Sequence, residues 1–303
     1  MKISGNTRLL GFFGSPASHS LSPAIYNYAF QQDDIDMCYL AFDIDKSSIE
    51  AGIWAMRTLN MAGANVSMPC KEKVMEYVDH IGKEAKLIGA VNTIINENGR
   101  LIGENTDAYG IVSAVSKLGV DIETASFVIL GCGGAAKSAI VGLCLKGAKD
   151  IKVAVRKQSE EKAKNRLEQL FASDDTSDLA HKSDLANKVT VINLENEQQL
   201  RNSLKQAKVL INATNVGMGT EAGKSLIKDI SMLHENLFVV DMIYHPRETK
   251  LMEDARKAGI QCEHITNGLS MLLGQAERAY YLYTGKQMDV ESVKEALIKD
   301  GLV

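Results

Sequence analysis

The chain has 303 residues, of which 45% are hydrophobic and 24% are charged, and its formal net charge is −4. This length accommodates about two domains of ordinary globular composition. The slightly negative net charge argues against a nucleic-acid-binding protein, which typically carries a basic surface. No apolar run reaches the roughly 18 to 20 residues of a membrane-spanning helix.

The first hundred residues alternate apolar, strand-like runs with amphipathic, helix-like runs. The pattern predicts strands at residues 8–13, 37–44 and 64–68, and helices at residues 23–31, 47–59, 71–78 and 83–88. A hairpin is predicted from residues 91–96 and 100–103, because the Asn98-Gly99 pair between them is a strong turn signal.

A second alternating series follows a predicted linking helix at residues 108–118. It predicts helices at 135–146 and 160–171, and strands at 127–130, 151–155, 189–194, 209–212, 238–242 and 261–263, with a polar surface loop at 172–188. Two final helices are predicted at 268–283 and 290–299. The repeated βα pattern predicts parallel sheets with right-handed crossovers, hence an α/β protein.

A glycine-rich loop follows the predicted strand 127–130, in the order Gly131, Cys132, Gly133, Gly134, Ala135, Ala136. In such a loop the first glycine makes a tight turn, the second lets the backbone approach a pyrophosphate, and a small third residue lets helix pack on strand. The helix that follows offers free N–H groups to phosphates. The loop therefore predicts dinucleotide binding by residues 131–135; a turn that serves packing alone is the alternative.

The residues after the second strand of this series indicate which dinucleotide is bound. An acid there would bind the ribose 2′-hydroxyl of NAD, whereas an arginine accommodates the 2′-phosphate of NADP. This chain has Arg156 and Lys157, and no acid before Glu160. We therefore expect NADP, with NAD as the alternative if Glu160 or Glu161 reaches the ribose.

Two polar positions in the first hundred or so residues are candidates for catalysis. Lys71 follows a strand-like run and Pro69, so it lies at a strand end, where open α/β sheets place ligands. Asp107 stands where the first series of elements passes into the second. The alternatives are a solvent-facing lysine in a first helical turn and a helix N-cap for Asp107. The hydroxyls of Ser20 and Ser22 precede a predicted helix and suit a carboxylate ligand; capping by Ser22 is their alternative.

The chain resembles the shikimate dehydrogenases over nearly its full length. The resemblance rests on the order and spacing of these motifs: Ser20-Leu21-Ser22-Pro23, Asn65-Val66-Ser67-Met68-Pro69-Cys70-Lys71, Gly89-Ala90-Val91-Asn92-Thr93, Asn105-Thr106-Asp107, the loop at Gly131, Asn212-Ala213-Thr214, Gly217-Met218 and residues 268–275.

The resemblance implies a reversible NADP-linked oxidation of shikimate to 3-dehydroshikimate, on the route to chorismate and the aromatic amino acids. It implies an N-terminal α/β substrate domain at residues 1–107, completed by residues 270–303, and a Rossmann-type doubly wound dinucleotide-binding domain at residues 108–269. The implied catalytic pair is Lys71 and Asp107. The implied substrate-binding residues are Ser20 and Ser22 for the carboxylate, Ser67, Asn92 and Gln275 for the hydroxyls, and Tyr244. Further cofactor-binding residues are Thr214, Met242 and Gly268, and no metal is implied.

The chain departs from the family pattern in places. Ser67 stands where the family more often has threonine, and Val155 replaces an asparagine before Arg156. The long segment 156–189 and the motif at 241–246 look more like the quinate/shikimate dehydrogenase branch, whose members can use NAD and often carry an aspartate where Gln158 stands. That branch is one alternative; a non-catalytic nucleotide-sensing homologue is another.

Partners and location are expected as follows. The partner is a small molecule, shikimate or 3-dehydroshikimate and, in the quinate branch, quinate, with no nucleic acid or membrane. The protein is expected to be a monomer or a homodimer. The N-terminal residues lack the apolar core of a signal peptide, and the five cysteines contain no C-x-x-C pair, so we expect a cytoplasmic protein without a zinc site.

Overall fold

The computed structural model describes residues 3–172 and 188–303, and divides them into two compact units. The first unit comprises Met1–Thr106 with Leu273–Val303, and the second comprises Asp107–Leu272. Each unit is built on a six-stranded sheet with helices, which confirms the predicted α/β class. Residues 173–187 of the predicted polar loop lie outside the described residues.

The sheet of the first unit has the strand order β2-β1-β3-β5-β6-β4. Its strands are β1 (Arg8–Gly14), β2 (Met37–Asp43), β3 (Gly63–Val66), β4 (His80–Ile81), β5 (Thr93–Glu97) and β6 (Arg100–Glu104). β2 and β3 run parallel to β1, whereas β5 is antiparallel to both β3 and β6. The sheet is therefore mixed: the βα pattern yields the parallel strands, and the predicted hairpin adds antiparallel ones.

The predicted hairpin itself is confirmed, as strands β5 and β6. Its loop consists of Asn98 and Gly99, whose φ angles are 54° and 92°. Two consecutive residues with positive φ are what the favoured two-residue hairpin turn requires. The Asn98-Gly99 pair thus determines the register in which Thr93 faces Glu104.

The helices of the first unit are α1 (Ser22–Gln32), α2 (Ile49–Thr58), α3 (Lys83–Ile88), α11 (Val290–Lys299) and the C-terminal part of α10 (Gly268–Thr284). The helix predicted at 71–78 is wrong in extent: only the short 3-10 helix η1 (Lys73–Glu76) forms. The reason is that the carbonyl of Lys71 accepts a hydrogen bond from the N–H of Val91 (2.8 Å), and so turns toward the sheet instead of along a helix axis.

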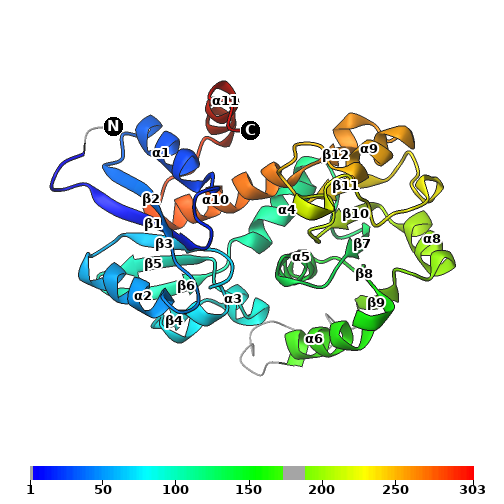
Figure 1. Ribbon diagram of the computed structural model, residues 1–303, viewed down its shortest axis with the longest axis horizontal. Helices are drawn as coiled ribbons and strands as arrows, with labels where there is room; N and C mark the ends of the chain where they lie inside the picture. The colour runs from blue at the N-terminus through cyan, green and yellow to red at the C-terminus, as the bar shows by residue number, and fades with distance from the viewer. Residues whose placement is uncertain (1–2, 173–187) are drawn as a thin grey trace. The chain divides into compact units, whose positions relative to one another are not determined.

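The C-terminal helices belong to the first unit because they pack on α1. The rings of Phe30 and Tyr280 stack with centroids 5.6 Å apart, and the hydroxyl of Tyr280 donates to Asp33 (2.5 Å). Tyr28 on α1 donates to Asp300, just beyond α11. In Figure 1 α11, in dark red, lies beside the blue α1. Residues from opposite ends of the chain therefore share one core.

The sheet of the second unit is parallel throughout, with the order β12-β11-β10-β7-β8-β9. Its strands are β7 (Ser126–Leu130), β8 (Asp150–Val155), β9 (Val189–Asn193), β10 (Val209–Asn212), β11 (Phe238–Asp241) and β12 (Ile265–Thr266). Numbered within the unit and read from β9, the order is 3-2-1-4-5-6. This is the order of the Rossmann fold, so the predicted doubly wound domain is confirmed.

The helices of the second unit are α4 (Asp107–Lys117), α5 (Gly134–Leu145), α6 (Glu160–Ala172), α8 (Glu197–Gln206) and α9 (Lys250–Lys257), with short 3-10 helices η2 (Lys157–Ser159), η3 (Gly219–Glu221), η4 (Ile230–Met232) and η5 (Cys262–His264). The strand predicted at 261–263 is wrong, because the N–H of His264 bonds the carbonyl of Gln261 (3.0 Å) and closes a local turn. No helix among the described residues is long and apolar enough to cross a membrane.

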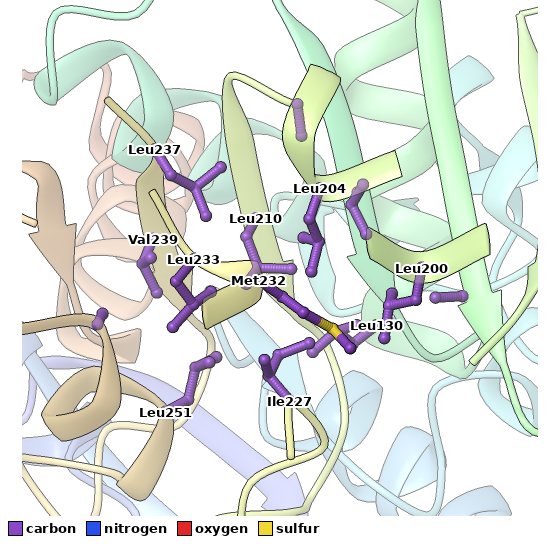
Figure 2. Close-up of a cluster of buried hydrophobic side chains, with 14 of the residues drawn as sticks. Leu130, Leu200, Leu204, Leu210, Ile227, Met232, Leu233, Leu237, Val239 and Leu251 are labelled. Carbon is purple, nitrogen blue, oxygen red and sulfur yellow. The ribbon is translucent and has the colours of Figure 1, made fainter. Parts of the chain in front are cut away.

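A buried apolar cluster attaches α8 and α9 to the second sheet. Figure 2 shows side chains from β7, β10 and β11 meeting Leu200 and Leu204 of α8 and Leu251 of α9. All are 4% exposed or less. Burying one such side chain stabilises a fold by about 1.5–3 kcal/mol. The cluster therefore holds the sheet rigidly beneath the loops at its carboxyl end.

One prediction concerns Glu104, the half-buried last residue of β6. Burial, and secondarily the negative charge of Glu84, raise its pKa above the usual 4.5, while Arg278 and His80 act in the opposite direction. Because the folded-state pKa is raised, the wild type should lose stability as the pH rises from 4.5 through that pKa. Glu104→Gln should therefore be more stable than the wild type at pH 7.

Urea denaturation from pH 4 to pH 8 measures this difference. The advantage of the glutamine variant should shrink toward pH 4, where the wild-type carboxyl is mostly protonated in both states. An advantage of the same size at every pH would show that ionisation of Glu104 is not its cause.

Candidate functional site

The first site lies at one edge of the sheet of the first unit. β1 and β3 are parallel neighbours, so their carboxyl ends lie at the same edge. The antiparallel β5 begins there and β6 ends there, with Asn65 opposite Thr93 and Thr93 opposite Glu104. This topology brings together the segments after Gly14 and Val66 with those that flank β5 and β6.

The serine segment leads from β1 into α1. Ser22 is the first residue of α1 and only 6% exposed, and its N–H donates to the hydroxyl of Ser20 (3.3 Å). The N-cap position belongs to Leu21, and no side chain caps the helix. The alternative that Ser22 serves as a cap is therefore wrong.

The lysine segment follows β3. The N–H of Ser67 donates to the carbonyl of Phe13 (2.8 Å), and the N–H of Ser15 donates to that of Met68 (3.1 Å), so the segment continues alongside the end of β1. Lys71 is half-buried and precedes η1. Its backbone bond to Val91 holds it next to the segment that carries Asn92. The alternative of a solvent-facing lysine within a helical turn does not describe this position.

A buried hydrogen-bond chain runs behind these segments. The amide of Asn65 donates to the hydroxyl of Thr93 (3.1 Å), which donates to the side-chain carbonyl of Asn92 (2.9 Å). The amide of Asn92 donates to the hydroxyl of Thr106 (3.1 Å), which donates to Gln275 (3.4 Å). All five residues are 9% exposed or less. The structure thus connects two predicted substrate-binding residues, Asn92 and Gln275, through intermediates that do not stand out in the sequence.

Asn65, Thr93 and Thr106 were missed as site residues. Their signal in the sequence is weak: each is a polar side chain next to an apolar run, a position that turns and caps also favour. Asp107 follows Thr106 directly and is the first residue of α4, which belongs to the second unit.

The glycine-rich loop of the second unit fits a dinucleotide. Gly131 has a φ of 94°, and a Cβ there would meet the Thr214 side chain at 2.6 Å. A Cβ on Gly133 or Gly134 would instead point into open space, with nothing within 4 Å. Gly133 is the N-cap of α5 and brings no side chain to cap it. The loop therefore leaves room and backbone donors for a pyrophosphate, as the sequence predicts.

The loops after β10 and β11 are braced by buried polar groups. Asn212 donates to Asp241 (3.1 Å) and accepts from the hydroxyl of Thr214 (2.7 Å), while Thr249 donates to Asp241 (2.7 Å). Burial raises the pKa of Asp241, and the hydrogen bonds from Thr249, Ile243 and Asn212 partly offset that rise. Thr214 therefore faces the glycine-rich loop in a fixed orientation.

Two predicted cofactor residues lie in direct contact near the end of β11. A Cβ on Gly268 would come within 2.2 Å of the carbonyl oxygen of Met242, and the N–H of Gly268 donates to Ile243 (2.9 Å). Only glycine allows this approach. Tyr244 follows at 39% exposure.

The loop after β8 presents exposed Arg156 and Lys157. Glu160 and Glu161 begin α6, but the carboxylate in contact with this loop is that of Glu195, which accepts the N–H of Lys157 (3.3 Å). Glu195 was missed because it follows β9, almost 40 positions along the chain. The adjacency of β8 and β9 in a parallel sheet is the signal that brings it here. Among residues 3–172 and 188–303, no group of His, Cys, Asp or Glu is placed to hold a metal ion.

The strand order and the glycine-rich loop define a protein with a Rossmann dinucleotide-binding unit joined to a second α/β unit. Comparison with known proteins narrows this class. Residues 12–94 match the profile "Shikimate dehydrogenase substrate binding domain", and residues 268–298 match "Shikimate 5'-dehydrogenase C-terminal domain".

Similarity to individual proteins extends over the whole length. The chain is 40% identical to the shikimate dehydrogenase (NADP(+)) of Alkaliphilus metalliredigens, over 98% of each chain. A crystal structure of the Listeria monocytogenes enzyme with shikimate and NAD is 34% identical, with a TM-score of 0.89 over 98% of each chain. The Thermus thermophilus enzyme with NADP(H) and shikimate is 27% identical, with a TM-score of 0.80 over 96% of this chain and 99% of that one. The chain belongs to the shikimate dehydrogenase family.

The two ends of the glycine-rich loop should respond differently to an added methyl group. Gly133 has a φ of −85°, which alanine tolerates, so Gly133→Ala should keep the wild-type melting temperature. The methyl should nevertheless obstruct the dinucleotide and raise the KM for the cofactor at least about tenfold, a loss of roughly 1.4 kcal/mol.

Gly131→Ala is the contrasting variant. Its positive φ and the contact with Thr214 should lower the free energy of unfolding by about 1–3 kcal/mol. Thermal melting and cofactor titration of both variants test the pair. A Gly133→Ala variant that binds cofactor like the wild type would place the pyrophosphate elsewhere.

Proposed function

We propose that this chain is an NADP-dependent shikimate dehydrogenase that interconverts shikimate and 3-dehydroshikimate on the route to aromatic amino acids. The observation that carries the proposal is the combination of a Rossmann unit with a sheet edge that gathers hydroxyl, amide and ammonium groups. Relatives of the same two-unit fold bind shikimate together with NAD or NADP(H).

The first unit, residues 1–107 completed by 270–303 in our proposed assignment, supplies most of the substrate contacts. The hydroxyls of Ser20 and Ser22 suit the ring carboxylate, because charge-assisted hydrogen bonds are the strong ones. Ser67, Asn92 and Gln275 suit the ring hydroxyls. Tyr244 is proposed as a further substrate-binding residue. Asn92 and Gln275 are anchored in the buried chain, so they should keep their orientation when substrate arrives.

Lys71 and Asp107 are proposed to handle the proton. When bound, NADP would supply the acceptor for the hydride that leaves the ring carbon. Lys71 hydrogen-bonds the oxygen on that carbon and takes up its proton, and Asp107 bonds the same oxygen or shares the proton with Lys71. A positioned general base typically contributes about 10²- to 10⁴-fold.

The second unit, residues 108–269 in this assignment, is proposed to hold NADP. Residues 131–135 take the pyrophosphate, and Thr214, Met242 and Gly268 line the way to the nicotinamide. Arg156 and Lys157 are proposed to bind the 2′-phosphate, since a guanidinium can pair with phosphate in a bidentate way. The carboxylate of Glu195, which contacts the same loop, would repel the 2′-phosphate, and this is a reason for NAD to remain a substitute cofactor.

We also propose that the protein resides in the cytoplasm. Its five cysteines, Cys38, Cys70, Cys132, Cys144 and Cys262, are all free thiols. Free thiols are typical of reducing compartments.

Steady-state oxidation assays test the function. Purified protein should reduce NADP when given shikimate, and faster than when given quinate. Absence of turnover with either acid and either cofactor would overturn the proposal and favour a nucleotide-sensing role. A higher kcat/KM for quinate would assign the chain to the quinate branch.

Replacement of Lys71 should remove the acid–base group without unfolding the protein. Lys71→Ala should lower kcat at least about 10²-fold, with the wild-type melting temperature. Asp107→Ala should lose comparable activity. If Asp107→Ala instead lowers mainly the melting temperature, Asp107 is a helix-start residue and not part of the chemistry.

The cofactor preference should depend on two opposite charges. Arg156→Ala should lower kcat/KM for NADP much more than for NAD, because only NADP carries the 2′-phosphate. Glu195→Gln should shift the ratio of the two kcat/KM values toward NADP, by removing a carboxylate from the same loop.

Glu197→Gln is the matched control, since Glu197 begins α8 and pairs with Arg201 (3.5 Å) instead of the loop. It should leave the cofactor ratio unchanged. Equal losses for NADP and NAD in Arg156→Ala would contradict a phosphate contact.

A further inference from the structure

Three tyrosines form a buried cluster behind the serine segment. Tyr39 of β2 is 0% exposed and stacks on Tyr26 of α1, with centroids 4.5 Å apart and an interplanar angle of 10°. Tyr283 meets Tyr26 edge-on at 6.1 Å. A phenol hydroxyl buried so completely is costly unless it is hydrogen-bonded. The Tyr39 hydroxyl meets this requirement, whereas the buried hydroxyls of Tyr26 and Tyr283 have no hydrogen-bond partner among the described residues.

The hydroxyl of Tyr39 extends the buried hydrogen-bond chain of the proposed substrate site. It donates to the side-chain carbonyl of Asn65 (2.8 Å). Asn65 is the start of the buried chain that ends at Gln275. Tyr39 therefore supplies the donor at the start of the network that includes the proposed hydroxyl-binding residues Asn92 and Gln275.

The backbone of Tyr39 attaches α1 to the same strand. The N–H of Tyr39 donates to the side chain of Asn27 (2.9 Å), and the amide of Asn27 donates to the carbonyl of Tyr39 (2.9 Å). Asn27 lies on α1, the helix that Ser22 begins. These two bonds therefore attach α1 to β2 at Tyr39.

We propose that Tyr39 is a positioning residue for shikimate: its hydroxyl orients Asn65, and through Asn65 the chain to Asn92 and Gln275, without touching the substrate. The inference rests on the proposed function, because it assigns a purpose to the orientation of the proposed hydroxyl-binding side chains. Burial raises the pKa of Tyr39 well above its ordinary value, so the phenol stays neutral and acts as a donor, not as a proton carrier.

The test is Tyr39→Phe, which keeps the stacked ring and removes only the hydroxyl. The loss leaves the side-chain carbonyl of Asn65 without its donor. Since one hydrogen bond contributes about 0.5–1.5 kcal/mol, the KM for shikimate should rise about three- to tenfold. The kcat should stay within about twofold and the KM for NADP should not change. The substitution alters neither the groups proposed to react with shikimate nor the second unit, which is proposed to bind NADP.

Tyr280→Phe is the matched control. Tyr280 is also 0% exposed, and its hydroxyl donates to Asp33 (2.5 Å) on the side of α1 that faces α10. It also loses the hydrogen bond of a tyrosine hydroxyl in the same unit, in this case to a partly buried carboxylate, so its melting temperature should fall too. Its KM for shikimate should match the wild type. All proteins are assayed at a temperature at which circular dichroism shows them folded.

The wild type is measured first, which separates the two hypotheses. No oxidation of shikimate by the wild type overturns the proposed function and this inference with it. Turnover by the wild type together with an unchanged KM in Tyr39→Phe overturns the inference alone. So does an equal rise of KM in Tyr280→Phe, which would reduce both effects to general destabilisation.

Discussion

The arrangement of the first unit depends on the need to hydrogen-bond the side-chain amide of Asn65. This amide lies at the end of β3 with 6% of its surface exposed, and an unpaired amide there would cost several kcal/mol of folding free energy, about 2–7 by transfer measurements. Its partners come from β2, from the start of β5 and, through Asn92, from the segment before α4. The hydrogen bonds that complete the core of the first unit therefore also align the side chains of the proposed substrate site.

The second unit also contains buried polar side chains at strand ends that must be hydrogen-bonded. Asn212 and Asp241 end neighbouring parallel strands and share a buried hydrogen bond, and Thr214 and Thr249 complete it. In both units an asparagine at a strand end holds the loops that carry the site. Parallel strands make this possible, because their carboxyl ends lie at one edge and leave backbone groups there for loops to bond.

Much of this fold can be predicted from sequence, and the failures have physical causes. The glycine-rich loop and the Asn98-Gly99 turn are local signals, since backbone conformation at those residues decides the structure. α8 and α9 escape prediction because only a few of their residues are buried, such as Leu200 and Leu251, and the rest are charged or polar. The strand predicted at 261–263 fails because hydrogen bonding within the turn competes with the sheet.

The residues of the candidate site likewise fall into those that the sequence predicts and those that it does not. Lys71 and the residues of the glycine-rich loop can be proposed from motif and strand end. The network from Tyr39 to Gln275 cannot, because its members lie on five separate segments and only tertiary packing brings them together. The role of Glu195 cannot be predicted for a related reason. Its contact with Lys157 depends on which strands are neighbours in the sheet, and no short sequence motif determines the strand order.

The two units also differ in how freely their specificity can evolve. The residues beside the proposed ribose phosphate site, Arg156, Lys157 and Glu195, are exposed and contribute little to packing. Substitutions there alter charge in a region that salt screens within about 8 Å at physiological ionic strength, with small effects on folding. The substrate side is built from buried groups that also hold the core together. Cofactor preference should therefore diverge readily among relatives, whereas a new substrate would require coordinated changes throughout the interior of the first unit.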